Sequence, residues 1–148
     1  MNEIRFSDAW WPLPTAVDFG SCVQDNIGVV QMNIGNNAAA LEYHEAALRL
    51  RTAMLGSNHV DVAATMDNMG LVYRQLNDLD KALEIHNKAL EIRLESIGPK
   101  DLGLCATKTA IANVYYQKES HEKALELYTE IFLAQVISRG IISLGAFV

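Results

Sequence analysis

Hydrophobic residues recur at helical spacing along most of the chain. In KALEIHNKALEIRL, residues 81–94, Ala, Leu and Ile return every three or four positions with Lys, Glu and Asn between them, a pattern typical of an amphipathic helix. KALEI occurs twice in this segment, seven residues apart, which is the spacing of a coiled-coil heptad. Turn residues at Asn77-Asp78 and Gly98-Pro99 bound the segment. They leave fewer than the roughly three or four heptads that a coiled coil requires.

The repeat that organises the chain is longer than a heptad. Residues 42–83 align without a gap on residues 84–125, a shift of 42 positions, and far more residues are identical than chance would give. His44 falls on His86, and KALEI itself returns 42 residues later as KALEL. Because a fixed period of this length is the signature of repeat architectures, we expect one domain that contains three copies of one unit.

The three copies are predicted to occupy residues 16–138. Their approximate boundaries are 17–58, 59–100 and 101–138. Residues 1–15 are expected to form an N-terminal cap segment and residues 139–148 an apolar C-terminal tail. Trp10-Trp11 could fold over the end of the first copy or serve as a short ligand for another domain. The tail could cap the third copy, or mark where a longer array continues.

Each copy contains two helical segments separated by a short turn. In the second copy, Asn58 is placed to cap a helix over about residues 60–76, and Asp78 to cap another that ends near Ser96. Asn and Asp suit these positions because their side chains accept hydrogen bonds from the free N–H groups at a helix start. Since short turns make successive helices antiparallel, each copy is expected to be a packed helix pair.

Residue size repeats along with polarity. One position of the first helices is always small, and it is occupied by Gly28, Gly70 and Ala112. A small residue there would let the second helix approach closely, whereas a bulky one would overpack the contact. His44 and His86 share a position of the second helices with Tyr128. We therefore interpret these histidines as packing residues and not as a metal-ligand pair.

These features resemble the tetratricopeptide repeat. That motif places a Leu-Gly pair and a Tyr in its first helix, and two Ala residues around an aromatic in its second. The second copy supplies Met69-Gly70, Tyr73, Ala82, His86 and Ala89. The period of 42 exceeds the usual length of about 34 residues and looks like that of the kinesin light chain subclass. The resemblance implies an all-α fold, a right-handed superhelical solenoid of three antiparallel helix pairs.

The composition and charge of the chain argue against some classes of binding partner. The net charge of −6 and pI near 5.1 argue against nucleic acid or an anionic membrane surface, since either would require a clustered basic face. The N-terminus has no basic start followed by an apolar core, so no secretory signal is expected. The C-terminal apolar run is interrupted by Arg139 and is shorter than the ~20 residues needed to cross a bilayer. We expect a cytoplasmic protein, with Cys22 and Cys105 as small buried core residues.

No motif indicates catalysis. The chain has no GxGxxG, Walker, GxSxG or HExxH motif. Its Asp and Glu pairs are explained as helix caps and solvated faces. We therefore expect a protein that is not an enzyme, with no catalytic residues, no metal site and no cofactor.

The resemblance implies that function lies on the concave surface, which the first helices line. The family's concave positions correspond here to twelve residues of a peptide-binding groove. They are Asp25, Val29, Met32, Asn33, Asp67, Leu71, Arg74, Gln75, Thr109, Asn113, Tyr116 and Gln117. Asp25 and Asp67 stand where a carboxylate clamp would need Lys and Asn, which favours a neutral or basic segment over an acidic one.

The leading hypothesis is a protein-interaction scaffold that binds an extended peptide or helix of a partner on this concave face. This would be similar to the cargo-binding repeats of kinesin light chains. The alternative is a structural fragment or short array that self-associates end to end through its terminal repeat, giving a homo-dimer through the C-terminal end.

Overall fold

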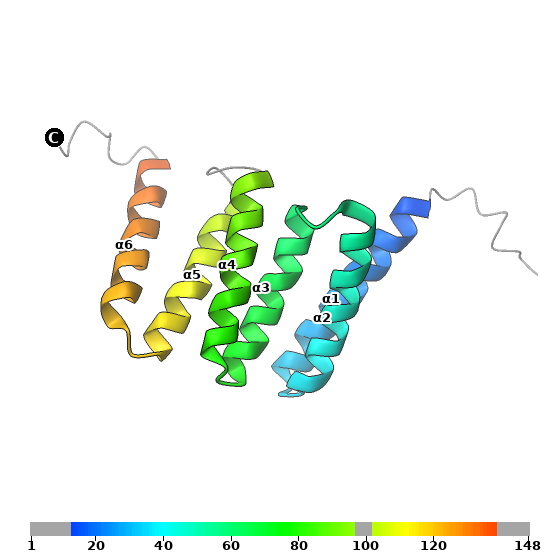
Figure 1. Ribbon diagram of the computed structural model, residues 1–148, viewed down its shortest axis with the longest axis horizontal. Helices are drawn as coiled ribbons and strands as arrows, with labels where there is room; N and C mark the ends of the chain where they lie inside the picture. Colours follow the sequence, from blue (N-terminus) through cyan, green and yellow to red (C-terminus); the bar gives the residue numbers. More distant parts are fainter. Residues whose placement is uncertain (1–12, 97–101, 139–148) are drawn as a thin grey trace, which may run out of the picture.

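The computed structural model describes residues 13–96 and 102–138, and all secondary structure in these ranges is helical (Figure 1). The helices are α1 (Leu13–Asn33), α2 (Asn37–Leu55), α3 (Val60–Gln75), α4 (Leu79–Ser96), α5 (Leu102–Gln117) and α6 (His121–Ser138). Trp10-Trp11, Gly98-Pro99 and residues 139–148 lie outside the described residues, so the expectations attached to them stay predictions.

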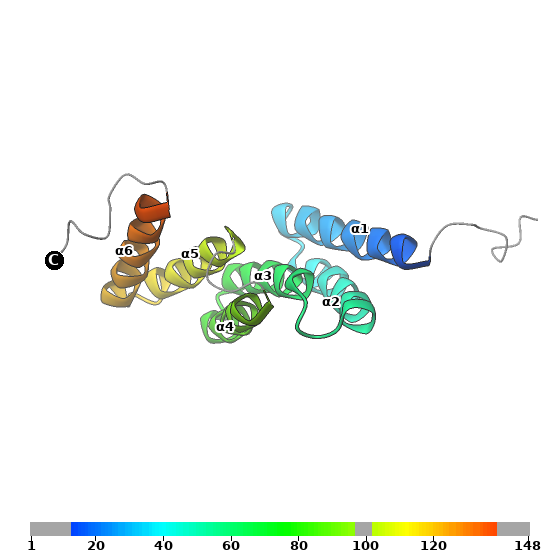
Figure 2. The ribbon, with the colours of Figure 1, turned by 90° about the horizontal axis from the view of Figure 1, so that it is seen from above.

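The helices pack as three antiparallel pairs in chain order. α1 packs on α2, α3 on α4 and α5 on α6, while α2 also contacts α3 and α4 contacts α5. Figure 2 shows the array from above, with α1, α3 and α5 following one another along one side. Within the described residues, α1 also contacts α3 and α3 contacts α5. The predicted all-α fold of three helix pairs is confirmed, and we call the side formed by α1, α3 and α5 the inner face.

The helix ends agree with the sequence in part. Asp78 Oδ1 accepts a hydrogen bond from the Lys81 backbone N–H at 3.3 Å, which confirms the predicted cap. The cap of α3 is His59 and not Asn58, because His59 Nδ1 accepts from the Asp61 backbone N–H at 3.2 Å. α1 begins at Leu13, so the first helix reaches into the segment that was expected to be a separate cap.

Small aliphatic residues make up the closest helix contacts. Ala40 and Ala47 of α2, and their equivalents one period later in α4, Ala82 and Ala89, have no exposed surface. Alanines at these sites let two helices approach without gaps, and burial of their methyl groups contributes to the hydrophobic stabilisation. Cys22 lies outside this core: it is exposed, and Cys105 is half-buried. The expectation that both cysteines are buried core residues was therefore wrong for Cys22, and Cys105 is only partly buried.

Two glycines of the first helices form seats for histidine rings. A Cβ built on Gly28 would lie 2.7 Å from Cε1 of His44, and one on Gly70 would lie 2.5 Å from Nε2 of His86. Both distances are far below van der Waals contact, and both rings are fully buried. The predicted packing role of these histidines is confirmed. In the third pair Ala112 replaces the glycine, and Tyr128 at the histidine position is 37% exposed.

Charged side chains occupy the outer surface of α4. Lys88 donates to Glu84 Oε1 at 2.7 Å, one helical turn away, and this hydrogen bond lowers the pKa of the Glu84 carboxyl. Lys81 lies over the ring of Tyr73, with Nζ 4.5 Å from the ring centroid, a cation–π contact. These exposed interactions leave the apolar side of α4 free to pack against α3 and α5.

The glycine seats generate a prediction. Gly70→Ala should lower the free energy of unfolding by about 1–3 kcal/mol, because the buried His86 ring has no room to move away from the new methyl group. Gly20→Ala is the matched control, since a Cβ at Gly20 would meet nothing within 4 Å. It should be neutral or stabilise by up to about 1 kcal/mol through helix propensity. Urea denaturation of both variants measures the difference, and equal stabilities would contradict the role of the seat.

Candidate functional site

The twelve groove positions fall into two groups on the inner face. Most lie on accessible turns of α1, α3 and α5, where their side chains are exposed or half-buried. The two aspartates do not share this exposure. The residue Asp25 is only 5% exposed, and the side chain of Asp67 is 16% exposed.

Asp25 points into the interface between the first two helix pairs. Its Oδ1 lies 2.8 Å from Nδ1 of His44. Since an ionised carboxylate only accepts hydrogen bonds, Nδ1 must carry the proton. Nε2 of His44 faces Gly28, and no described group bonds to it.

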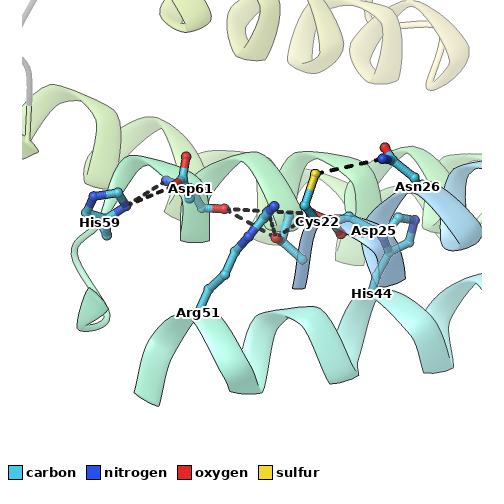
Figure 3. A network of polar contacts seen from close by, with 8 residues as sticks. Cys22, Asp25, Asn26, His44, Arg51, His59 and Asp61 are labelled. Carbon is cyan, nitrogen blue, oxygen red and sulfur yellow. Dashed lines mark hydrogen bonds and ion pairs between the residues drawn. The ribbon is translucent and has the colours of Figure 1, made fainter. Parts of the chain in front are cut away.

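The other carboxylate oxygen of Asp25 binds side chains from two further helices, and Figure 3 shows Arg51 beside Asp25. Arg51, from α2, forms a short ion pair with Oδ2 through Nη1. Thr65, from α3, donates its hydroxyl to the same oxygen at 2.9 Å and accepts from Arg51 Nη1 at 2.5 Å. Arg51 also donates to the backbone carbonyl of Asp61 at 3.1 Å. One buried carboxylate thus joins the first helix pair to the first helix of the next.

The same arrangement recurs one period later. Asp67 of α3 accepts from His86 Nδ1 at 2.9 Å and from Arg93 Nη2 at 3.2 Å. Thr107 of α5 donates to Asp67 Oδ2 at 2.6 Å. Gly103 stands where the first network has Asp61, and a Cβ there would lie 2.0 Å from Arg93 Nη1. The guanidinium is therefore packed directly against the start of α5. We call each set of Asp, His, Arg and Thr a joint network.

The third helix pair has no joint network. Its equivalent positions hold Thr109, Tyr128 and Gln135, which carry no charge. The Tyr128 hydroxyl donates to Asn113 Oδ1 on the neighbouring helix, and Thr109 donates to the Cys105 carbonyl at 2.7 Å. The polar contacts of Thr109 and Tyr128 thus stay within this helix pair.

Asp25 and Asp67 expose less surface to a ligand than the sequence suggested. Their carboxylates are held by Arg, His and Thr side chains, Asp25 is buried and Asp67 is partly buried, and their part in peptide binding stays a prediction. An ionised group can leave water only when it is paired and hydrogen-bonded, which explains why these carboxylates lie among Arg, His and Thr side chains. The sequence carried a signal for this: His, Arg and Thr were identical one period apart at positions 44, 51 and 65 and their equivalents. That identity could have indicated a repeated buried contact.

The remaining groove positions form a mixed surface. Asn33, Gln75 and Gln117 are exposed amides, and Tyr116 is 63% exposed. Among the amides, Gln117 donates to Asn77 Oδ1 at 3.1 Å. The half-buried positions are Val29, Met32, Leu71, Arg74, Thr109 and Asn113. Hydrogen-bonding groups therefore alternate with apolar ones along the inner face.

Arg74 sets the charge of this surface. The joint networks neutralise Asp25 and Asp67 through Arg51 and Arg93. Arg74 is half-buried, and no acidic group within residues 13–96 or 102–138 forms an ion pair with it. The preference for a neutral or basic ligand was deduced from two free aspartates. The structure removes that basis, because the groove's one unpaired charge among the twelve positions is a cation.

Neither a metal cluster nor a membrane span is present in the described part of the chain. It contains no group of three or more His, Cys, Asp or Glu residues that could hold a metal ion. None of the described helices has both the length and the apolar character needed to cross a membrane.

Comparison with known sequence families shows which repeat these helix pairs match. Residues 21–95 and 72–132 match the tetratricopeptide repeat, which together spans most of the chain. No curated protein sequence matches it.

Solved structures share the fold. BtubC (BKLC) from P. vanneervenii superposes with a TM-score of 0.73 at 21% identity, over 81% of this chain and 48% of that one. A putative kinesin light chain of Podosopora anserina with nearly identical TPR-like repeats gives 0.67 at 17% identity, over 80% of this chain and 56% of that one. A second crystal structure of that protein gives 0.69 at 18% identity, with the same coverage. The chain thus spans about half the length of these structures, and the expected likeness to kinesin light chain repeats is confirmed.

The joint networks generate a stability prediction. Asp67→Asn should lower the free energy of unfolding by about 3–5 kcal/mol, because it leaves the buried Arg93 guanidinium without its counter-charge. Thr109→Ala alters the equivalent position in the pair without a network and should cost no more than about 1 kcal/mol. Chemical denaturation monitored by circular dichroism compares the two. A loss for Asp67→Asn no greater than that for Thr109→Ala would refute the network's role.

Proposed function

This chain belongs to the tetratricopeptide repeat family, and we propose that it holds an extended segment of a protein partner along its inner face. The repeats make it a protein-interaction scaffold. Stacked helix pairs of this kind present a long, continuous surface instead of a closed pocket. A partner segment in extended conformation matches such a surface because it can contact α1, α3 and α5 in succession.

Amide side chains supply the contacts to the partner's backbone. Asn33 and Gln75 are exposed, and each offers both donors and an acceptor. An extended peptide has free N–H and C=O groups that alternate along its length, and these groups need partners of both kinds. Contacts of this type hold a backbone without selecting its sequence, so they position the ligand.

Apolar positions would then seat the ligand's side chains. Val29, Met32 and Leu71 are half-buried between the amides. Each therefore has surface left to cover, and burial of apolar surface stabilises a complex by about 25 cal/mol per Å² before the costs of association. Tyr116 adds a ring that is 63% exposed, and tyrosine is enriched at the energetic centres of interfaces.

Arg74 carries the proposal. It is a half-buried cation on the central first helix, and the described residues offer it no ion-pair partner. Partial burial keeps its side chain oriented and reduces solvent screening of its charge. A carboxylate of the partner would form the charge-assisted, bidentate hydrogen bonds for which a guanidinium is suited. The favoured ligand is therefore an extended segment with one acidic side chain flanked by apolar ones.

A peptide array tests this proposal. Arg74→Ala should weaken binding of acidic–apolar peptides by about 1–2 kcal/mol, roughly 5- to 30-fold, because hydrogen bonds to a charged group are lost. Arg49→Ala is the matched control: this arginine is on α2, its side chain is 72% exposed, and it lies 4.0 Å from Glu45. Fluorescence anisotropy with the strongest peptides gives the dissociation constants. If both substitutions weakened peptide binding equally, or if neither weakened it, the assigned role of Arg74 would be ruled out.

A further inference from the structure

The outer side of α1 exposes residues whose equivalents are buried elsewhere. Val30 is 58% exposed, whereas Val72 and Val114, one and two periods later, have no exposed surface. Val23 is 41% exposed, whereas its equivalents Thr65 and Thr107 are fully buried. In α3 and α5 these positions face the preceding second helix. On α1 they present the same contact surface without a described helix against it.

The outer side of α6 presents the opposite half of that contact. Leu125 is 68% exposed and Phe132 is 62% exposed. Their equivalents in α4, Leu83 and Leu90, are half-buried, and α4 packs against α5, whereas no described helix follows α6. Tyr128 is 37% exposed at the position that places a buried histidine in both other pairs. The two ends of the array thus expose complementary halves of one kind of interface.

The two halves differ from the internal interfaces in a matched way. On α1, Val23 replaces the threonine that bonds to the carboxylate in each joint network. In the third helix pair, Thr109 replaces the aspartate of the joint network and Gln135 replaces its arginine. Valine has the shape of threonine without its hydroxyl, so it suits a neighbour that offers no buried charge to bond. Each end therefore lacks the hydroxyl or charged groups that would be left unpaired if the other end packed against it.

We propose that a second copy of this chain covers each end, with α6 of one copy docked on α1 of the next. The contact would repeat the packing of α4 on α5 and bury Leu125 and Phe132 against Val23 and Val30. It joins two different surfaces, so it is a heterologous contact that adds copies in one direction. Because the contact buries no charge at the joint positions, it needs no ion pair and depends on apolar burial. The inner face stays open along the assembly.

Two charge substitutions test the geometry. Val30→Glu places a carboxylate on the α1 surface and Phe132→Glu places one on the α6 surface, and both sites are more than half exposed, so the fold is retained. Leu94→Glu is the matched control, since Leu94 is 43% exposed on α4 and away from both end surfaces. Circular dichroism and thermal melting check that all three variants fold. Sedimentation velocity over a concentration series measures their mass.

Mixing the variants separates this contact from its alternatives. The wild-type chain and Leu94→Glu should gain mass with concentration beyond a dimer, and each end variant alone should stay monomeric. An equal mixture of Val30→Glu and Phe132→Glu should form a dimer and nothing larger, because one intact α6 surface meets one intact α1 surface.

Three results would overturn the proposal. A Val30→Glu protein that still dimerises would indicate that α6 pairs with α6. A wild-type chain that stays monomeric at all concentrations would leave the ends to another occupant, such as residues 1–12 and 139–148 of the same chain. A mixture of the two end variants that stays monomeric would show that the two surfaces do not meet.

Discussion

A carboxylate that is largely removed from water at each internal joint is the constraint on which this array depends. An ionised aspartate away from water is tolerated only when cationic and hydrogen-bonding groups surround it. Asp25 obtains them from two further helices: His44 and Arg51 of α2, and Thr65 of α3. His44 and Arg51 belong to the same helix pair as Asp25, and the hydroxyl of Thr65 completes the set only when the next pair is docked. We infer that the network favours the register in which Thr65 reaches the carboxylate.

That fixed register has consequences for the binding surface. The inner face is built from three separate first helices, and a partner segment would contact all of them. If the pairs could slide, the spacing between Arg74 and the amides beside it would vary. Binding would then have to order these side chains, which would reduce the free energy of association. The networks hold Asp25 and Asp67 within the joints, so they fix the spacing of the first helices without using the exposed groups of the inner face. The third pair lacks such a network, and its side chains at those positions are neutral.

The period of 42 was enough to predict the fold, because period, turn residues and small positions all indicated the same helix pairs. His44 and His86 were correctly assigned to packing, and glycine opposite each ring explains why the fit is so close. The groove was predicted less well. A position that the family places on the concave surface holds Asp25, yet its side chain turns into the joint because Arg51, more than half a repeat away in the chain, supplies its counter-charge. Such a contact is tertiary, and local sequence patterns do not encode which of two faces a polar residue will choose.

A double-mutant cycle between Asp25 and Thr65 tests the claim that the carboxylate connects successive repeats. The two residues are 40 positions apart in the chain and belong to different helix pairs, and the hydroxyl donates to the carboxylate at 2.9 Å. Free energies of unfolding would be measured for Asp25→Asn, Thr65→Val, the double variant and the wild type. The account predicts a coupling energy of about 1–2 kcal/mol, in the range of residues that share one hydrogen-bond network. Additivity within about 0.3 kcal/mol would contradict it, because the carboxylate would then stabilise its own helix pair without joining it to the next.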